Sequence, residues 1–178
     1  MKLINYLEDD QYPKSNKPYK VREIVRAVIL NDNDEVCLTH ILADDMFGHR
    51  DYYELPGGGI QKGESKLKAL SREIKEEVGY ETKLIGEIGK VIDFYNLLER
   101  ENHNYYYLLR ATNYVGTSHT QNEKRLINKI IWIPFKEAIT LVSNHQSEGI
   151  AQLLKARELP VLIEAKRLYE LKLALDDK

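Results

Sequence analysis

Residues 55–80 read LPGGGIQKGESKLKALSREIKEEVGY, a glycine-rich turn that leads into a helical pattern. The run Pro56-Gly57-Gly58-Gly59 is a strong break in regular structure. A helix over 65–78 would then collect the apolar positions of the segment on one face, namely Leu67, Leu70, Ile74 and Val78. Gly79 follows directly, where a glycine in the left-handed conformation commonly ends a helix. The stretch therefore predicts a loop followed by a helix that ends at Gly79.

Three glutamates lie near one another on this helix, and two of them, Glu73 and Glu77, flank its apolar face. With about 100° per residue, Glu77 lies about 60° from the centre of that face, Glu73 about 100° and Glu76 about 160°. Carboxylates four residues apart repel each other by about 0.2–0.5 kcal/mol even on an exposed helix. Carboxylate oxygens suit hard cations such as Mg²⁺, which would reverse that repulsion. The helix alone allows a solvated charged face, and the glycine loop before it favours a metal–phosphate site.

The rest of the chain supplies β-prone runs before and after this helix. We predict strands at 21–30, 35–41, 52–55, 84–95, 105–114 and 127–133, with a polar loop at 42–51. Helices are expected at 135–142, 146–157 and 160–175. Residues 1–20 are expected to form an irregular arm or a short edge element. This order indicates an α/β or α+β sandwich rather than regular β-α alternation.

Length and charge narrow the class of protein. A chain of 178 residues is expected to form one domain over 1–178, with an N-terminal arm at 1–20 and a helical extension at 146–178. The net charge of −2 favours no specific nucleic acid as partner. The single cysteine, Cys37, excludes an internal disulfide. The absence of a long apolar run predicts no membrane span and no signal peptide, so a cytoplasmic location is expected.

The spacing of fixed residues resembles the Nudix box. Gly58 is followed after five residues by Glu64, and after seven more by Arg-Glu-Ile-Lys-Glu-Glu-Val-Gly-Tyr at 72–80. Tyr80 stands where the family usually has a bulky aliphatic residue. Trp132-Ile133-Pro134 resembles the last strand of the family and the start of the helix after it. The resemblance covers about residues 20–142.

This resemblance implies a fold, an activity and a site. The fold would be the Nudix α/β/α sandwich with a mixed sheet, here with additional C-terminal helices. The activity would be hydrolysis of a phosphoanhydride in a nucleoside diphosphate linked to another moiety, with Mg²⁺ or Mn²⁺ as cofactor. The residues carried over are Glu73 and Glu77 as metal ligands with Glu76 beside them, the carbonyl of Gly57, Arg72 holding the cluster, and Glu64 and Gly79 as structural residues of the motif.

The general base and the substrate contacts stay open. The base is either Glu76 or Glu123, which lies in the polar loop before the last strand. Arg50 is a candidate to contact a phosphate of the substrate, and Tyr53 is a candidate to contact its nucleobase. Gly58 and Gly59 leave backbone groups free to approach a ligand. The expected partner is a small-molecule nucleotide. The C-terminal segment packs on its own domain or forms a homodimer interface.

Two other functions use the same fold. One is a non-catalytic nucleotide-binding or regulatory module, against which the intact glutamate set argues. The other is an isomerase of isoprenoid diphosphates, which needs a catalytic cysteine in its pocket. Cys37 is the only candidate, and it lies in an apolar stretch.

Overall fold

The computed structural model of the protein describes residues 1–145 and 148–176. Within them the chain forms a sheet of eight strands with helices on both sides. The strands are β1 (Leu3–Leu7), β2 (Lys20–Leu30), β3 (Glu35–Asp45), β4 (Gly48–Glu54), β5 (Gly57–Gly59), β6 (Tyr80–Tyr95), β7 (Arg100–Tyr114) and β8 (Ile127–Pro134). The helices are α1 (Lys66–Glu77), α2 (Glu123–Leu126), α3 (Phe135–Ser143) and α4 (Ile150–Asp176), with a 3₁₀ turn, η1, at Asn96–Leu98.

The sheet is mixed and divides in its middle. β1 pairs with β6 and β2 with β7 in parallel, whereas β6 and β7, β3 and β4, and β3 and β8 are antiparallel. β2 and β3 are paired where Leu30 faces Val36, beside their connecting turn. Beyond that turn β2 pairs with β5 and β7, while β3 pairs with β4 and β8. The sheet is therefore open between β2 and β3.

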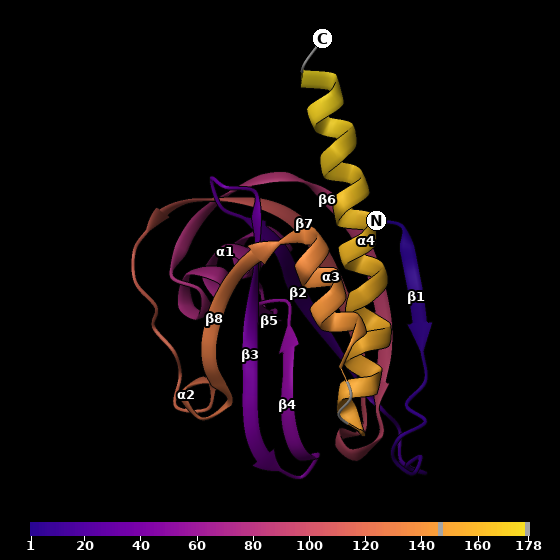
Figure 1. Cartoon of the computed structure of the whole chain (residues 1–178). Helices are drawn as coiled ribbons and strands as arrows, with labels where there is room; N and C mark the ends of the chain where they lie inside the picture. Colours follow the sequence, from indigo (N-terminus) through magenta and orange to yellow (C-terminus); the bar gives the residue numbers. More distant parts are fainter. Residues whose placement is uncertain (146–147, 177–178) are drawn as a thin grey trace.

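The central strand β2 is buried on both faces. Val25, Ala27 and Ile29 pack with α1, whereas Val28 and Leu30 pack with α3 and α4. Successive residues of a strand point to opposite faces, so the continuous apolar run of β2 supplies both cores. Figure 1 shows α1 on one side of the sheet and α3 with α4 on the other. The predicted α/β/α sandwich with a mixed sheet is confirmed.

The predicted glutamate helix forms almost as expected. α1 begins after Ser65, whose hydroxyl oxygen accepts a hydrogen bond from the Lys68 N–H. Its buried face contains Ala69, Leu70 and Ile74. Leu67, at the start of the same face, is 52% exposed. The buried stripe is narrower than the sequence pattern suggested.

Two segments expected to be irregular form strands. Within residues 1–20, β1 pairs with β6, so the short edge element is confirmed. The polar loop predicted at 42–51 was wrong, because β3 and β4 continue through it and meet in a hairpin with Gly48 at φ +84°. A cross-strand ion pair of Arg50 with Asp45 and a hydrogen bond between His49 and Asp44 stabilise this polar hairpin.

The two helices predicted at 146–157 and 160–175 are one helix, α4, with Pro160 inside it. Residues 146 and 147 lie outside the described part of the chain. Proline lacks the N–H that would bond the carbonyl four residues earlier, at Ala156. That carbonyl accepts a hydrogen bond from the Asn5 side chain at 3.4 Å instead. Apolar packing before and after the proline keeps the helix continuous.

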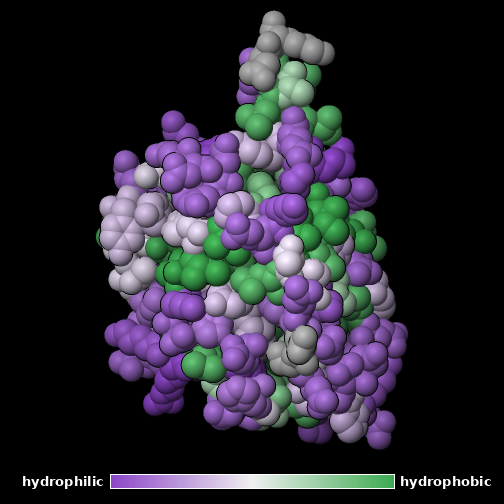
Figure 2. Space-filling model, in the orientation of Figure 1, coloured by the Kyte–Doolittle hydropathy of each residue, from purple (hydrophilic) through white to green (hydrophobic). Residues whose placement is uncertain are grey.

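The end of α4 projects beyond the sheet. Val161, Leu162 and Ala165 are buried against the core, which confirms packing on its own domain for this part. Further along, the exposed side chains include Leu173 and Leu175, and Figure 2 shows apolar side chains on the projecting end. The predicted apolar stripe therefore leaves the core after Tyr169. No helix among the described residues is long and apolar enough to cross a membrane.

Candidate active site

The rotation of α1 about its axis decides where its glutamates point. Ala69, Leu70 and Ile74 pack onto the sheet, and this turns the flanking Glu73 and Glu77 inward. Glu73 is 8% and Glu77 7% exposed. Gly79, at φ +81°, closes the helix with its N–H directed at the carbonyls of Ile74 and Lys75. The two carboxylates that sequence spacing placed beside the apolar stripe are thus the buried ones.

Strand β5 passes between β2 and these carboxylates, and only glycine fits there. A Cβ on Gly57, which has φ +144°, would lie 2.1 Å from the Val25 carbonyl oxygen. A Cβ on Gly58 would lie 2.2 Å from a carboxylate oxygen of Glu73. The Gly57 N–H donates to Glu77 Oε2 at 2.8 Å. The glycine loop therefore brings backbone into direct contact with the glutamates.

A cavity of about 280 Å³ opens at these glycines, in the split between β2 and β3. Its polar wall comes from five elements that are far apart in sequence. The polar and glycine residues that line it are Arg22, Arg26, Glu54, Gly57, Gly58, Gly59, Glu73, Glu77, Asn122 and Glu123, and the apolar ones are Ile24, Ile41, Leu126 and Ile127.

Arg72 holds the cluster from outside the cavity. Its guanidinium donates to both carboxylate oxygens of Glu64, at 3.0 and 2.9 Å, and to the Gly59 carbonyl at 3.1 Å. It also donates to Glu73 Oε1 at 2.7 Å and to Glu76 Oε2 at 3.1 Å. Bidentate and charge-assisted bonds of this kind fix geometry strongly. Arg72 therefore ties the start of the loop to the glutamate face of α1.

The two candidates for the general base occupy different places. The Glu123 side chain lines the cavity and accepts a hydrogen bond from the Thr120 N–H at 2.6 Å. The predicted loop here contains a short helix, α2, which begins at Glu123. Glu76 is not among the residues that line the cavity, and its carboxylate faces Arg72. Of the two, only Glu123 lines the cavity.

Two predicted substrate contacts lie elsewhere. Arg50 donates to Asp45 at 2.6 Å and to the Tyr52 hydroxyl at 3.3 Å within the β3–β4 hairpin. Tyr53 stacks on His40 with ring centroids 4.6 Å apart. Neither side chain lines the cavity. The hairpin that sequence analysis took for a loop keeps these residues in cross-strand contacts.

Sequence reasoning missed two cavity arginines on β2. Arg22, Ile24 and Arg26 occupy alternate positions and face the cavity together. Arg26 donates to the Leu55 carbonyl at 2.9 Å. No carboxylate of the described residues lies within ion-pair distance of Arg22. The alternation of Arg22, Ile24 and Arg26 at the start of the apolar run of β2 was the available signal.

The charged groups of the cavity have shifted pKa values that charged ligands would affect. Burial raises the pKa of Glu77 to about 8, and the nearby Glu54 carboxylate acts in the same direction. Burial also raises the pKa of Glu73, against the effect of Arg72. Burial, followed by repulsion from Arg100 and Arg26, lowers the pKa of Arg22. A cation near the glutamates and an anion near Arg22 would each relieve these costs.

The donor set fits a hard divalent cation that is completed by substrate. Glu73 and Glu77 offer carboxylate oxygens at one wall of the cavity. No three acidic, histidine or cysteine side chains within residues 1–145 and 148–176 are gathered closely enough to chelate an ion by themselves. Mg²⁺ is usually bound by one or two carboxylates together with waters and substrate phosphates. Two glutamates facing a phosphate-sized space meet that requirement.

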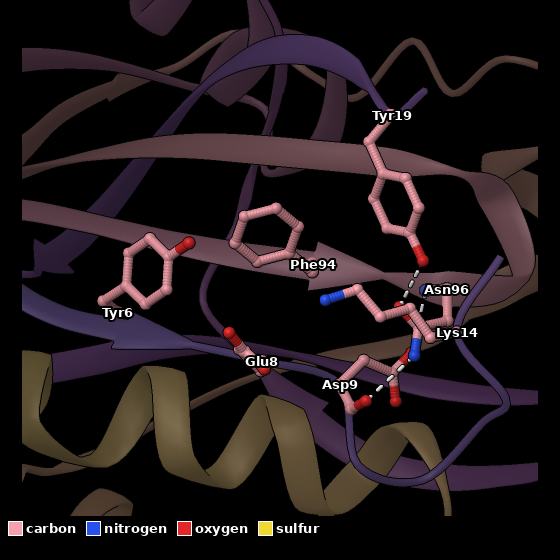
Figure 3. Close-up of a pocket in the computed structure, with 7 residues that line it drawn as sticks. All are labelled: Tyr6, Glu8, Asp9, Lys14, Tyr19, Phe94 and Asn96. Atoms are coloured by element: carbon pink, nitrogen blue, oxygen red, sulfur yellow. Dashed lines mark hydrogen bonds between the residues drawn. The ribbon is translucent and has the colours of Figure 1, made fainter. Parts of the chain in front are cut away.

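A second, smaller hollow lies under the N-terminal arm (Figure 3). It has a volume of about 80 Å³ and is lined by Tyr6, Glu8, Asp9, Lys14, Tyr19, Phe94 and Asn96. The Tyr19 hydroxyl donates to Asn96 Oδ1 at 2.6 Å, and Asn96 donates to the Asp9 carbonyl at 2.9 Å. These bonds fasten the arm to the end of β6. The hollow is too small for a nucleotide and does not include the α1 glutamates.

Cys37 is fully buried in the core between the sheet and α1, and it does not line the cavity. Burial raises the pKa of its thiol well above the ordinary value. A cysteine in this position cannot act as the catalytic group of an isoprenoid diphosphate isomerase. The structure therefore removes the residue on which that alternative depended.

Known proteins share this fold and parts of this sequence. An RNA pyrophosphohydrolase of Ruthia magnifica subsp. Calyptogena magnifica is 41% identical over 69 residues, which make up 39% of this chain and 35% of that protein. An 8-oxo-dGTP diphosphatase of Escherichia coli (strain K12) is 38% identical over 60 residues, 34% of this chain and 45% of that protein. The chain thus spans less than half the length of these two relatives.

Solved structures and a family model give the wider match. A NUDIX hydrolase from Nitrosomonas europaea has a TM-score of 0.60 at 17% identity, over 88% of this chain and 90% of that one. A UDP-X diphosphatase has a TM-score of 0.55 at 17% identity, over 89% of this chain and 66% of that one. The model of the NUDIX domain matches residues 20–153. Because this segment is well over half of the chain, the protein belongs to the Nudix family.

Proposed function

We propose that the protein hydrolyses a phosphoanhydride bond of a nucleotide, with a divalent cation held by Glu73 and Glu77. One observation carries the proposal: the two buried glutamates face an arginine-lined cavity across a strand of glycines. The names of the two relatives, a pyrophosphohydrolase and a diphosphatase, support the same reaction class. Mg²⁺ and Mn²⁺ both suit carboxylate ligands.

The residues of the cavity would have different roles in the reaction. Glu73, Glu77 and the carbonyl of Gly57 would hold the cation, which when bound neutralises phosphate charge and lowers the pKa of a coordinated water. Arg22 would bind a phosphate of the substrate, since a guanidinium at the cavity wall without a carboxylate partner suits an anion. Glu123 would accept a proton from the attacking water.

The other members of the box support these groups. Arg72 and Glu64 keep the glycine loop and α1 in register through their bidentate pair. Glu76 shares Arg72 with Glu73 and thereby orients it. Gly58 and Gly59 line the cavity, and their lack of a Cβ leaves room there for the Glu73 carboxylate and the Arg22 guanidinium. Ile24 and Ile41 give the cavity an apolar wall that limits access of bulk water.

The substrate follows less directly from the site. The relatives are named for RNA and for 8-oxo-dGTP, and a structural neighbour for a UDP-linked compound. The 5′-triphosphate end of RNA, 8-oxo-dGTP and a UDP-linked compound each contain a phosphoanhydride next to a nucleoside, which is the chemistry that the glutamates and Arg22 would recognise. We therefore include the triphosphate end of RNA among the candidate substrates, beside the small nucleotides expected from the sequence.

A substrate panel with matched variants tests the proposal. Purified protein is incubated with Mg²⁺ or Mn²⁺ and 8-oxo-dGTP, unmodified nucleoside triphosphates, nucleotide sugars, ADP-ribose, dinucleoside polyphosphates or 5′-triphosphorylated RNA, and released phosphate or pyrophosphate is measured. We expect turnover of at least one class, its loss in Glu73→Gln, and full activity in Lys83→Gln, a surface control far from the cavity. Turnover that persists in Glu73→Gln would contradict the metal assignment, and nucleotide binding without turnover would favour a binding module.

A further inference from the structure

A cluster of buried charges connects α4 to the cavity from the opposite side of the sheet. Arg157 and Glu158, near the middle of α4, are 1% and 0% exposed. Arg157 Nε donates to Glu158 Oε1 at 2.8 Å. Its Nη1 donates to the Tyr95 hydroxyl at 2.9 Å and to Asp93 at 3.3 Å, and its Nη2 donates to Glu54 Oε2 at 3.4 Å. Arg157 therefore reaches a carboxylate that lines the cavity.

Glu158 holds the next residue of the same segment. Its Oε2 accepts the Leu55 N–H at 3.0 Å, and its Oε1 accepts the Tyr106 hydroxyl at 3.0 Å. From the other side Arg26 donates to the Leu55 carbonyl at 2.9 Å. The backbone at Leu55 is thus fixed at both its N–H and its carbonyl by charged side chains, one from α4 and one from β2.

This clamp lies two residues from the proposed metal site. Leu55 is followed by Pro56, whose ring fixes one backbone torsion and whose carbonyl accepts the Ala27 N–H at 3.0 Å. Gly57 comes next, and its N–H donates to Glu77 Oε2. A displacement of Leu55 would therefore move Gly57 against Glu77.

Stability alone does not explain such a cluster. Replacement of a buried ion pair by apolar residues of similar volume is often neutral or stabilising, because desolvation offsets the attraction of the charges. The surrounding core of α4 is apolar, with Leu154 and Val161 on either side of the pair. Charges placed in that core, and bonded to the segment that leads to Gly57, favour a role in holding the site.

We propose that Arg157 and Glu158 are positioning residues of the hydrolytic site, which fix Glu54 and the contact between Gly57 and Glu77 through the Leu55 backbone. The proposal rests on the proposed function for its catalytic consequence. It makes α4 part of the active-site architecture, although the match to the NUDIX domain ends at residue 153.

The central comparison is Glu158→Ala against Glu158→Gln. Alanine leaves the Leu55 N–H without its acceptor, whereas glutamine keeps an oxygen for this N–H and gives up only the acceptor for Arg157 Nε at the other position. We expect Glu158→Ala to weaken Mn²⁺ affinity or kcat by about 10- to 100-fold, the usual effect of losing a group that orients a metal ligand. Glu158→Gln should restore both to within about threefold, and KM should change less than kcat. Arg167→Met, which removes an exposed ion pair with Glu164 on the same helix, is the control.

Amide hydrogen exchange in the metal-free protein tests the mechanical link without substrate. In Glu158→Ala, amide exchange at Leu55 and Gly57 should become faster relative to the β7 amides. The hydrogen bond from the Leu55 N–H to Glu158 is absent in this variant, so local opening no longer has to break it. Mn²⁺ titration by calorimetry and turnover of the nucleotide identified in the panel complete the set. Arg157→Lys, which keeps the charge but loses the planar fork, serves if the alanine variant does not fold, and kcat should fall about tenfold.

The outcomes separate the two proposals. A folded Glu158→Ala protein with unchanged Gly57 exchange, Mn²⁺ affinity and kcat overturns the positioning role, while the proposed function stands. Equal losses in Arg167→Met also overturn it, because the effect would then be general to α4. Faster Gly57 exchange in a protein whose Glu73→Gln variant retains full turnover supports the mechanical link and refutes the metal site instead.

Discussion

Glu77 gives the sharpest test of the site, because its burial has a calculable consequence. In the metal-free protein burial raises the pKa of this carboxyl to about 8, from an ordinary value of 4.5. The folded protein then holds the proton more tightly than the unfolded chain, so ionisation of Glu77 opposes folding. Its contribution to stability is fully present below pH 4.5 and is lost as the pH rises through 8.

The size of the effect follows from 1.36 kcal/mol per pKa unit. Between pH 5 and pH 8 this one group should lower the free energy of unfolding by about 3–4 kcal/mol. For a protein of this size each kcal/mol shifts the melting temperature by roughly 2–4 °C. The metal-free protein should therefore lose on the order of 10 °C from this cause.

The variant Glu77→Gln isolates the effect. Glutamine keeps the length of the side chain and an oxygen for the Gly57 N–H, but it does not ionise. With a chelator present, we expect wild type and variant to melt at similar temperatures near pH 5, and the variant to melt roughly 10 °C higher at pH 8. The difference between the two proteins cancels other titrating groups, such as His145, that they share.

Added Mn²⁺ should close most of this difference. At a concentration one hundred times its Kd, a bound ion stabilises the folded state by about 2.7 kcal/mol. Wild type should gain this stability at pH 8, and Glu77→Gln should gain little and show no turnover. Parallel pH curves for the two proteins would refute the buried, raised-pKa carboxylate. Equal stabilisation of both by Mn²⁺ would refute its role as a metal ligand.

Four further substitutions test other parts of the cavity. In Gly58→Ala the added methyl group would meet the flexible end of the Glu73 side chain. We therefore expect a folded protein whose turnover in steady-state assays is reduced by about 100-fold. In Gly57→Ala the methyl group would meet rigid backbone, so this substitution should instead lower the melting temperature. Arg22→Met should raise KM at least about tenfold with a smaller change in kcat if it binds a substrate phosphate, and an unchanged KM would remove it from the site. Glu123→Gln should lower kcat by about 10²–10⁴-fold; a loss smaller than tenfold would exclude it as the general base.

Local patterns in the sequence predicted the glutamate helix and the central strands. The apolar spacing of α1 gave its rotation, and hence the inward direction of Glu73 and Glu77, because helix geometry is fixed by residues three and four apart. The stop at Gly79 and the break at the three glycines are also local signals. These features needed no knowledge of where the rest of the chain lies.

The rest of the cavity depends on contacts between distant segments. Arg22 and Arg26 read as ordinary charges in a strand until pairing with β5 places them beside the glycines. Arg50 looked available for phosphate because its segment has loop composition, yet cross-strand pairing with Asp45 takes up its charge. Pro160 suggested a helix break, which the donor from Asn5 and the apolar packing on both sides overcome. Each failure came from a tertiary contact that outweighs a local preference.

The distribution of buried charges also explains why a cation would be favoured near the cavity rather than near α4. A connected series of buried or nearly buried groups runs from α1, through the split in the sheet, to α4. It contains two guanidiniums, of Arg26 and Arg157, and four carboxylates, of Glu54, Glu77, Asp93 and Glu158. The α4 end is balanced by Arg157, which touches three of the four carboxylates.

The excess of negative charge is therefore concentrated at Glu77, whose nearest donor is a neutral backbone N–H. Protonation of Glu77 relieves it in the metal-free state, and a divalent cation would relieve it during turnover. The same carboxyl group thus lowers the stability of the metal-free protein at alkaline pH and, under the proposed function, would provide affinity for the metal.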